Sequence, residues 1–283
     1  MTKTWFITGT STGFGRELTE RVLARGDRVA AALRRPATLN ELASRHRKQL
    51  WVRELDVNNI EQLRAAVRAA FRELGRVDVV VSNAGYGLLG AAEELTDEQI
   101  TAQIQTNLVG SIQLARAVVP HLRAQGGGRI LQLSSSCGQI GLPALSLYTA
   151  TKWAIEGFYE SFAPEIAPFG IHTCLVEPGS ARTDFAFRSR AEAPPMDAYA
   201  ATPAGQMRAG VYAQQPRDLP GDVAKIVTAM IAAADADELP ARLLLGSDAY
   251  QLVHAALAAR LTLVEAQKNL ALSTDADDYR AAA

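Results

Sequence analysis

The sequence predicts an α/β fold with a mostly seven-stranded parallel sheet and helices on both of its faces. Seven short apolar runs predict the strands: Thr4–Thr8, Arg28–Leu33, Leu50–Leu55, Val77–Ser82, Arg129–Ser134, Ile171–Glu177 and Arg242–Leu245. Segments with helical periodicity alternate with them, among them residues 15–26, 59–75, 107–125 and 151–170. Strands that are apolar throughout and alternate with amphipathic helices are typical of a parallel sheet covered on both faces. Right-handed crossovers then give a doubly wound, Rossmann-type sheet.

Length and composition indicate one domain that spans residues 1–283 and works in the cytoplasm. A net charge of -1, with the charges interspersed, gives no field that favours nucleic acid or an anionic membrane as a partner. No apolar run reaches the roughly 18 residues of a membrane span, and the N-terminus has no signal peptide pattern. Cys137 and Cys174 lie in apolar, strand-like contexts and match neither a disulfide framework nor a metal site, so we expect reduced core thiols and no metal.

One stretch departs from the alternating pattern. Residues 185–221 are rich in alanine, proline and glycine, and they are too long for an ordinary connection between a strand and a helix. Long excursions of this kind are often lids or substrate loops. We therefore expect a mobile substrate-binding flap within the single domain.

The end of the first predicted strand carries a glycine-rich turn. The letters TGTSTGFG place glycines at positions 9, 13 and 15, just before a predicted helix. Glycines let the backbone turn tightly and approach a pyrophosphate, and a helix N-terminus offers free N–H groups to it. The spacing is G-x-x-x-G-x-G rather than the usual G-x-G-x-x-G dinucleotide pattern. The turn nevertheless predicts a nucleotide site at this edge of the sheet.

The second strand ends at Leu33 and is followed by Arg34 and Arg35. An NAD site usually has an acidic residue here for the ribose 2′-hydroxyl, whereas an arginine accommodates a 2′-phosphate. We therefore predict that NADP(H) is preferred, with NAD(H) possible as the alternative. Arg34 is expected to meet the 2′-phosphate, with help from Ser11 or Arg35.

The next strand ends carry small and polar residues. Asp56 follows the third strand, where its carboxylate could accept from an adenine amino group or cap the next helix. The fourth strand ends in the letters SNAG (82–85), the fifth in SSSCG (134–138) and the sixth in EPGSART (177–183). In doubly wound sheets ligands bind beyond these carboxyl ends, so the residues are candidates for one site.

A tyrosine and a lysine stand four residues apart in the letters SLYTATK. On a helix this spacing puts Tyr148 and Lys152 on one face. A neighbouring ammonium stabilises a phenolate, so we expect Lys152 to lower the pKa of Tyr148 from about 10. A tyrosine tuned in this way can act as a general acid or base. Ser135, 13 residues before Tyr148, could hold a carbonyl oxygen while the tyrosine protonates it.

These motifs occur in a characteristic order: T-G-x-x-x-G-x-G, D-V, N-A-G, a helical asparagine, a serine, Y-x-x-x-K and P-G-x-x-x-T. In this combination the sequence resembles the short-chain dehydrogenases/reductases, from about residue 3 to residue 184. Two departures are small, since Phe14 stands where the family usually has isoleucine or leucine, and SNAG replaces the commoner NNAG. The C-terminal hundred residues match only in length and apolar character.

The resemblance implies roles for particular residues. Tyr148 would be the catalytic acid/base and Lys152 its partner, which also holds the nicotinamide ribose. Ser135 would contact the substrate carbonyl, and Asn107 would support a water-linked proton relay to the lysine. The implied cofactor contacts are Gly9, Ser11, Gly13, Phe14 and Gly15 at the phosphate turn, Asp56 and Val57 at the adenine, Asn83, Ala84 and Gly85 along the cofactor, and Pro178, Gly179 and Thr183 at the nicotinamide.

The function expected from this resemblance is hydride transfer between a nicotinamide and a carbonyl or secondary alcohol. The substrate pocket is expected to be apolar and is predicted to be lined by Leu88, Leu142, Leu145, Phe185 and Phe187, with Met196 and Tyr199 from the flap. A hydrophobic ketone, aldehyde or alcohol fits such a pocket, unless Arg182 or Arg188 swings inward and binds an anion. The alternative is a nucleotide-sensing regulatory protein on the same fold, because a fold does not fix a function.

The predicted helices Asn107–Gln125 and Tyr148–Phe169 are apolar around much of their circumference. A helix of this kind needs a second burial surface. In the related family this pair of helices forms a four-helix dimer contact, and closed symmetry is the common solution. We therefore predict a homodimer or homotetramer, with contact residues that include Ala115, Val118, Val119, Ala154, Phe158 and Phe162.

Overall fold

A seven-stranded parallel sheet forms the centre of the computed structural model, which describes residues 2–187, 190–276 and 278–279. Its strand order is β3-β2-β1-β4-β6-β7-β9, and every strand pair in it is parallel. The strands are β1 (Thr4–Thr8), β2 (Arg28–Leu33), β3 (Leu50–Glu54), β4 (Val79–Ser82), β6 (Gly128–Leu133), β7 (Ile171–Pro178) and β9 (Arg242–Leu245). The predicted fold class is confirmed, and each predicted strand is present to within two residues at either end.

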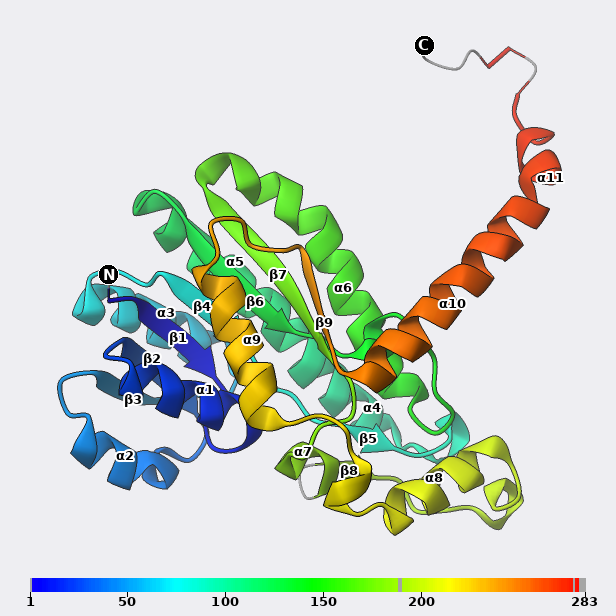
Figure 1. The fold of residues 1–283 in the computed structure, drawn as a ribbon, viewed down its shortest axis with the longest axis horizontal. Helices are drawn as coiled ribbons and strands as arrows, with labels where there is room; N and C mark the ends of the chain where they lie inside the picture. Colours follow the sequence, from blue (N-terminus) through cyan, green and yellow to red (C-terminus); the bar gives the residue numbers. More distant parts are fainter. Residues whose placement is uncertain (1, 188–189, 277, 280–283) are drawn as a thin grey trace.

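Helices cover both faces of the sheet (Figure 1). One face carries α1 (Gly13–Ala24), α2 (Asn40–Arg45) and α9 (Val223–Asp235). The other face carries α3 (Ile60–Leu74), α5 (Gly110–Ala124) and α6 (Ser146–Ile166), with α4 (Asp97–Ile104) before α5. The central strands are therefore buried on both sides, which is why their sequences are apolar without alternation.

Two hydrophobic clusters, one on each side of the sheet, hold these layers together. Phe6 of β1 packs with Leu114 of α5 and Ile155 of α6 on one side. Trp5 and Ile7, which alternate with Phe6 along the same strand, pack into the cluster that contains α1 and α9 on the other side. Successive side chains of a strand point to opposite faces, so one continuous apolar run serves both clusters.

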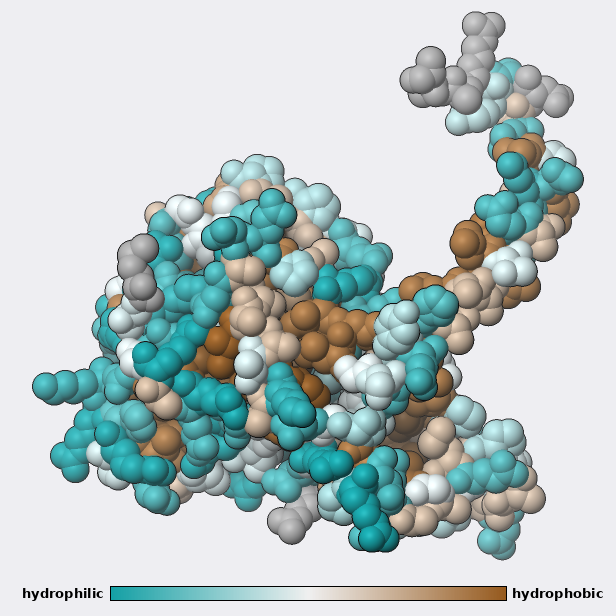
Figure 2. Space-filling model, viewed as in Figure 1, coloured by the Kyte–Doolittle hydropathy of each residue, from teal (hydrophilic) through white to brown (hydrophobic). Residues whose placement is uncertain are grey.

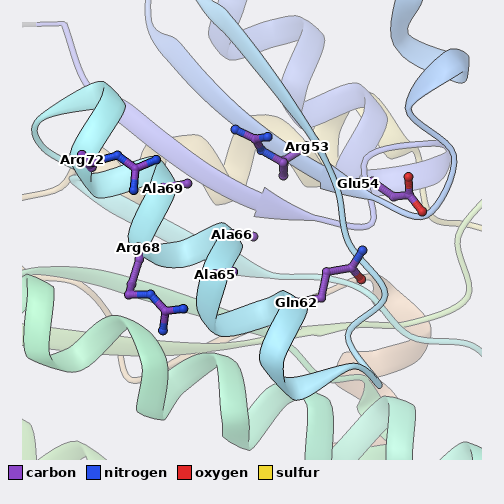
Figure 3. A pocket seen from close by; sticks show the side chains of 8 residues that line it. All are labelled: Arg53, Glu54, Gln62, Ala65, Ala66, Arg68, Ala69 and Arg72. Carbon is purple, nitrogen blue, oxygen red and sulfur yellow. The ribbon is translucent and has the colours of Figure 1, made fainter.

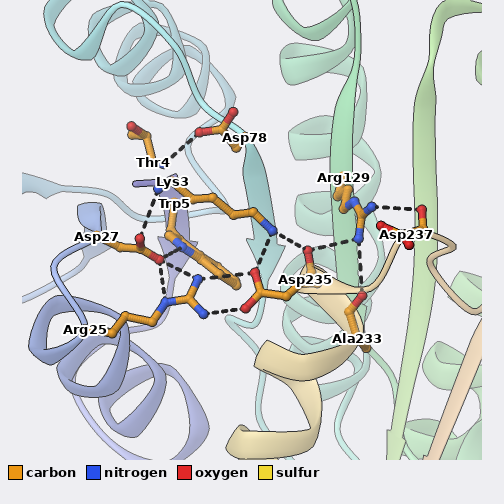
Figure 4. A network of polar contacts seen from close by, with 11 residues as sticks. Lys3, Thr4, Trp5, Arg25, Asp27, Asp78, Arg129, Ala233, Asp235 and Asp237 are labelled. Carbon is orange, nitrogen blue, oxygen red and sulfur yellow. Dashed lines mark hydrogen bonds and ion pairs between the residues drawn. The ribbon is translucent and has the colours of Figure 1, made fainter. Parts of the chain in front are cut away.

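The N-terminal edge of the sheet is held by a polar network around Asp27 (Figure 4). Asp27 is 4% exposed and accepts hydrogen bonds from the backbone N–H of Lys3 at 2.9 Å and from the Trp5 indole at 2.8 Å. Arg25 bridges Asp27 and Asp235, the last residue of α9. The network joins the start of β1 to α9 at the amino ends of the strands. The predicted ligand site lies at the opposite, carboxyl ends, so the role of the network is structural.

The predicted flap segment contains α7 (Asp184–Phe187), β8 (Ala191–Glu192) and α8 (Pro203–Ala213). The strand β8 pairs in parallel with β5 (Leu88–Leu89) in a second, two-stranded sheet that the sequence did not indicate. A buried ion pair between Arg208 of α8 and Glu94 also ties the segment to the body. Figure 1 shows these elements gathered at one end of the molecule, below the large sheet.

The C-terminal part of the chain leaves the body as a helix. α10 (Ser247–Ala266) buries only Ala249 and Val253, and α11 (Lys268–Leu272) buries no residue. Residues 257–272, here named the C-terminal arm, project away from the sheet (Figure 1). Figure 2 shows apolar surface along the arm. Within the described residues, no helix is both long and apolar enough to cross a bilayer.

Candidate active site

The predicted site residues other than those on helices lie at the carboxyl ends of the parallel strands or in the loops that follow them. The strand order reverses direction between β1 and β4, and a crevice for ligands is expected at such a switch point. A Cβ placed on Gly9 after β1 would lie 2.9 Å from the Asn83 side chain after β4. A Cβ placed on Gly13 would lie 3.7 Å from the Thr183 side chain after β7. The folded chain therefore brings three of the predicted strand-end motifs together.

The turn between β1 and α1 has the geometry that a phosphate group needs. Gly9 and Gly13 have φ angles of 71° and 57°, which favour glycine, and a Cβ on Gly15 would lie 2.4 Å from the Gly9 carbonyl oxygen. The N-cap residue of α1, Thr12, makes no side-chain capping bond, and the first turn of α1 holds no acidic residue. The first N–H groups of α1 are thus left for an anion. These residues fit the pyrophosphate of a dinucleotide.

Asn83 and Ala84 fix the position of this turn. The Asn83 amide donates to the carbonyl oxygens of Thr8 and Gly9 at 2.9 and 3.0 Å, and the Thr8 hydroxyl accepts from the backbone N–H groups of Asn83 and Ala84. The asparagine side chain therefore joins the ends of β1 and β4. These two hydrogen bonds to the backbone of the turn explain why an amide side chain is needed at this position.

Arg34 is exposed directly after β2, and its charge lowers the pKa of the Tyr86 phenol against the rise that burial causes. The guanidinium therefore lies on the same side as the loop that follows β4. Asp56 accepts a hydrogen bond from the Asn58 N–H at 3.0 Å, as a turn-capping residue does. Val57 is 8% exposed and packs against Gly110, where a Cβ would lie 3.2 Å away. The phosphate-selecting position is thus open, while Val57 is mostly covered.

Asn107 lies in a π-helical turn (Gln105–Val109) between α4 and α5, so the first three residues of the helix predicted over 107–125 belong to this turn. The residue is 1% exposed. Its amide exchanges hydrogen bonds with the backbone of Tyr86 at 2.9 and 3.1 Å and donates to the Thr151 hydroxyl at 3.3 Å. π-helical turns are rare and occur frequently at functional sites. Asn107 therefore links the loop after β4 to α6, next to Lys152.

Tyr148 and Lys152 lie on one face of α6, as predicted, with the Lys152 Nζ 5.7 Å from the centre of the Tyr148 ring. Both are buried, at 7% exposure each. Ser135, after β6, is 9% exposed and its hydroxyl favours the phenolate form of Tyr148. The three predicted catalytic groups are therefore in one cluster.

The expected lowering of the Tyr148 pKa is wrong for this structure. Burial raises the pKa of Tyr148 well above its usual range, and the nearby Cys137 raises it further. Burial also lowers the pKa of Lys152 to about 8, against the opposing effects of Glu156 and Cys137. The physical reason is desolvation, which disfavours both charged forms and cannot be estimated from a helical spacing. The phenol is thus a proton donor at neutral pH.

Lys152 is held by the end of β6. Its Nζ donates to the Leu133 carbonyl oxygen at 2.8 Å, two residues before Ser135. Cys137 lies in a 3₁₀ turn (Ser136–Gly138) rather than in the strand-like context that we expected, although it is buried as predicted. Its N–H donates to the Ser135 hydroxyl at 3.2 Å, so the turn orients the serine.

Phe185 lies against Tyr148 of the predicted catalytic cluster. Its ring centre lies 5.8 Å from that of Tyr148, and a Cβ on Gly87 would lie 3.2 Å from the Phe185 ring. Leu142, Leu145 and Phe187 are partly buried, whereas Leu88 is 2% exposed and belongs to β5. The flap residues Met196 and Tyr199 lie farther along the chain, where the Tyr199 hydroxyl donates to Glu93 at 2.8 Å. Phe185 is the predicted pocket residue that the structure brings against Tyr148.

The turn after β7 is braced from α10. Pro178 ends the strand, and a Cβ on Gly179 would lie 2.3 Å from the Asp248 carboxylate, which also accepts from the Ser180 N–H at 2.7 Å. Thr183 is 7% exposed. The Arg182 Nε donates to the Leu219 carbonyl oxygen at 2.8 Å, which holds this arginine against the chain before α9. Arg188, the other arginine considered for an anionic substrate, lies outside the described residues.

Several residues around the site were not found from the sequence. Tyr86 and Thr151 hold Asn107, and Glu156 acts on Lys152. A glutamate one turn after the lysine on the same helix was the available signal for Glu156. Tyr86 directly follows the N-A-G motif, but no sequence pattern indicates that its backbone is the hydrogen-bond partner of Asn107.

A separate hollow of about 470 Å³ lies on the surface between β3 and α3 (Figure 3). Arg53 and Glu54 of the edge strand line it, together with residues of α3, and none of the lining residues was predicted to belong to the site. The hollow is wide open to solvent and lacks a cluster of buried titratable groups. We therefore place the active site at the carboxyl ends of the strands, where such groups converge.

Comparison with known proteins identifies the family of the chain. A family model described as short chain dehydrogenase matches residues 3–194. Oxidoreductase BOA17 of Botryotinia fuckeliana is 38% identical over 256 residues, which cover 89% of this chain and 91% of that protein. Human 17-beta-hydroxysteroid dehydrogenase type 1 is 37% identical over 188 residues, which cover 63% of this chain and 57% of that protein.

The fold comparison extends over the C-terminal part of the chain as well. The crystal structure of a short-chain dehydrogenase from Streptomyces avermitilis matches with a TM-score of 0.90 at 34% identity. The match covers 98% of this chain and 100% of the Streptomyces chain. The sequence match reaches across the strand-end motifs, and the structural match includes the sheet that positions them. The chain therefore belongs to the short-chain dehydrogenase family and is an oxidoreductase.

Proposed function

We propose that this protein transfers a hydride between NADP(H) and a hydrophobic ketone, aldehyde or secondary alcohol. The observation that carries the proposal is the buried cluster of Ser135, Tyr148 and Lys152 beside the glycine turn. A nucleotide-sensing protein without turnover would have no need for a buried phenol next to a buried ammonium. The relatives, which are named as oxidoreductases or dehydrogenases, also favour turnover.

The chain supplies the proton transfer and the binding of the growing charge. The cofactor, when bound, supplies or accepts the hydride. Because its pKa is raised, Tyr148 is protonated at neutral pH and can give its proton to the substrate oxygen as negative charge develops there. The Ser135 hydroxyl donates to the same oxygen. Lys152 stabilises the phenolate that remains, and Asn107 continues the proton path towards solvent.

The preference for NADP(H) over NAD(H) rests on the second strand end. Arg34 is exposed directly after β2 and no acidic residue follows Leu33, so the position offers a cation for a 2′-phosphate and no acceptor for a 2′-hydroxyl. Gly9, Gly13 and Gly15 would hold the pyrophosphate. Gly85, Pro178, Gly179 and Thr183 would lie along the nicotinamide half.

An apolar substrate is favoured by the ring that covers Tyr148. Phe185 supplies an apolar wall, and the Arg182 guanidinium is held at Leu219 by a hydrogen bond. The names of two relatives bear on the substrate. One is the 3-ketodihydrosphingosine reductase of Bacteroides thetaiotaomicron, which is 37% identical over 63% of this chain. The other is the 17-beta-hydroxysteroid dehydrogenase type 1 described above. Both names refer to a substrate with a keto or hydroxyl group. We propose that residues 185–221 form the flap over this substrate, within a single domain.

A substrate screen with NADPH tests the function. Neutral aromatic and alkyl ketones should be reduced with a higher kcat/KM than keto acids of matched size, as followed by NADPH consumption. A preference for the keto acids that is lost in Arg182→Ala would contradict the apolar pocket. No consumption of NADPH or NADH with any carbonyl, and no reduction of either oxidised cofactor with alcohols, would contradict the proposed reaction.

We also infer that the protein forms a homodimer or homotetramer and works in the cytoplasm. The basis for the assembly needs a correction, because Ala115, Val118 and Phe162 are buried in the chain's own core and offer little surface to a partner. Val119 and Phe158 are partly buried and Ala154 is exposed. The C-terminal arm offers additional apolar surface for a second copy.

The cytoplasmic location is supported by two buried free cysteines, which a reducing compartment favours.

A further inference from the structure

A network of buried charges lies directly behind the catalytic cluster. Glu156 of α6 and Glu177 of β7 are 3% and 0% exposed. Both accept hydrogen bonds from the same guanidinium nitrogen of Arg242, the first residue of β9. Arg242 also contacts Glu160, whose side chain is 64% exposed. Carboxylates are rarely buried so completely without a reason, since removing a charge from water is costly unless it is paired.

Both buried carboxylates accept hydrogen bonds from side chains of the segment after β6, which carries Ser135. Glu156 Oε1 accepts from the Ser134 hydroxyl at 2.5 Å, and Ser134 precedes Ser135. Glu177 precedes Pro178 at the nicotinamide end, and its second oxygen accepts from Gln139. Glu156 itself follows Lys152 by one helical turn. The carboxylate of Glu156 is thus held next to the segment of Ser135 and on the helix of Lys152.

The surrounding residues leave no freedom in the placement of Glu156. A Cβ on Gly138 would lie 1.7 Å from Glu156 Oε1, so only a glycine leaves room for the carboxylate. Arg242 Nη1 donates to Oε2 at 2.6 Å. The carboxylate is therefore held from three sides, by Ser134, by Arg242 and by the bare Cα of Gly138.

When both buried carboxylates are ionised, the charges of the buried groups balance if Lys152 is protonated. Two buried carboxylates, Glu156 and Glu177, face one guanidinium, and Lys152 is the second cation. Burial and the neighbouring Glu156 raise the pKa of Glu177, as expected for two carboxylates that share one arginine. The other titratable groups near Lys152 are Tyr148 and Cys137. A neutral lysine would leave a net negative charge in this cluster.

We propose that Glu156 acts through Lys152: its fixed carboxylate favours the charged form of the lysine, and Arg242 and Ser134 hold that carboxylate. The inference rests on the proposed catalytic role of Lys152. Glu156 needs no contact with the substrate or the cofactor to act in this way. A purely structural role for the network would affect folding and stability but would leave the titration of Lys152 unchanged.

The test is Glu156→Gln, which removes the charge and keeps the size and an acceptor for Ser134. The pKa of Lys152, measured by NMR on protein with labelled lysine, should fall by about one unit, because an opposite charge nearby favours the protonated form. The chain has five lysines, so the Lys152 signal can be assigned with Lys152→Arg. The alkaline limb of the pH profile of kcat should move down by the same amount.

Two further variants sharpen the result. Glu156→Asp restores the charge and should return both readouts towards the wild-type values. Glu165→Gln removes the same charge from an exposed position of the same helix and should change neither. A folded Glu156→Gln protein with an unchanged Lys152 pKa and an unchanged alkaline limb would overturn the inference.

The NMR titration also separates this inference from the proposed reaction. If the wild type reduces no carbonyl, the proposed function is wrong, while the Lys152 pKa still tests the role of Glu156. If Glu156→Gln does not fold, the wild type alone decides: Lys152 should titrate at about 8. A wild-type value below about 7 would mean that a nearby carboxylate does not keep the lysine charged, and the inference would fail.

Discussion

Tyr148, the proposed catalytic acid, shows what burial does to a single side chain. The phenol is enclosed by α6 and by the Phe185 ring, and the resulting desolvation raises its pKa. A protonated phenol beside a lysine is suited to reduction at neutral pH, because it can donate a proton and its conjugate base is then stabilised. In the reverse reaction the same groups would need a higher pH to generate the phenolate.

Replacing Tyr148 by phenylalanine should lower kcat by about 10²- to 10⁴-fold, since general acid catalysis typically contributes that much. The ring would still fill its place, so the Kd for NADPH, measured by fluorescence titration, should change little. Tyr159→Phe is the matched control, because Tyr159 is a buried tyrosine of the same helix whose hydroxyl has no partner among the described residues. Full activity of Tyr148→Phe would contradict the assigned role.

Arg34 decides the choice of coenzyme in our proposal. Arg34→Ala should weaken NADPH binding by about 1.5–3 kcal/mol, the usual worth of a charge-assisted contact to phosphate, and should leave NADH binding nearly unchanged. The two kcat/KM values, measured with one ketone, check this. If the wild type is more efficient with NADH than with NADPH, the preference for NADP(H) is wrong.

At the scale of elements, a buried ion pair joins α8 to the body. Glu94 accepts from both terminal nitrogens of Arg208 and from the backbone N–H groups of Ala91 and Met196. These bonds, Arg208 first, lower the pKa of Glu94 from 4.5 to about 2. The contact anchors the outer part of the flap segment, so a movement of the flap is expected nearer to α7 than to α8.

The pH dependence of stability follows from this lowered pKa. Because folding lowers it, the contribution of the pair is complete above pH 4.5 and is lost as the pH falls towards 2. Glu94→Gln should cost about 3 kcal/mol of unfolding free energy at pH 7, since it leaves Arg208 buried without its charge partner. The difference from the wild type, measured by urea denaturation, should shrink as the pH falls through that window. Glu93→Gln, at the exposed neighbouring position, should cost far less.

At the scale of the whole molecule, the chain exposes more surface than a compact monomer would. Its accessible area is 14661 Å², against about 11,800 Å² expected for a monomer of this mass. Leu257, Leu261 and Val264 of the C-terminal arm lie at helical spacing and are 47%, 61% and 65% exposed. An isolated helix with such a face is marginal in water, so this surface favours contact with a second copy.

Light scattering should therefore give a particle of twice or four times 30.4 kDa at micromolar concentration. The double variant Leu261→Glu/Val264→Glu should reduce the mass of the particle or weaken its assembly if the arm forms a contact. Thr262→Glu adds a charge to an exposed position between them and serves as the control. A wild-type mass of 30.4 kDa would contradict the proposed assembly, and an unchanged mass of the double variant would exclude the arm from the contact.

The sequence by itself determined the sheet, its two covered faces and the strand ends where the site lies. Apolar runs, helical periodicity and the glycines at 9, 13 and 15 are local signals, and each depends on geometry that a few neighbouring residues already impose. The pairing of Tyr148 with Lys152 was predictable for the same reason, because one turn of helix fixes it.

Only the tertiary structure decided the electrostatics of the site and which side chains pack against Tyr148. Arg242 meets Glu156 across 86 residues of chain, and Phe185 reaches Tyr148 from a different segment. The direction of the Tyr148 pKa shift was wrong from sequence because burial, which depends on every surrounding element, outweighs the charge of one neighbour. Contacts between distant segments are set by the packing of the whole sheet, and a local pattern carries no information about them.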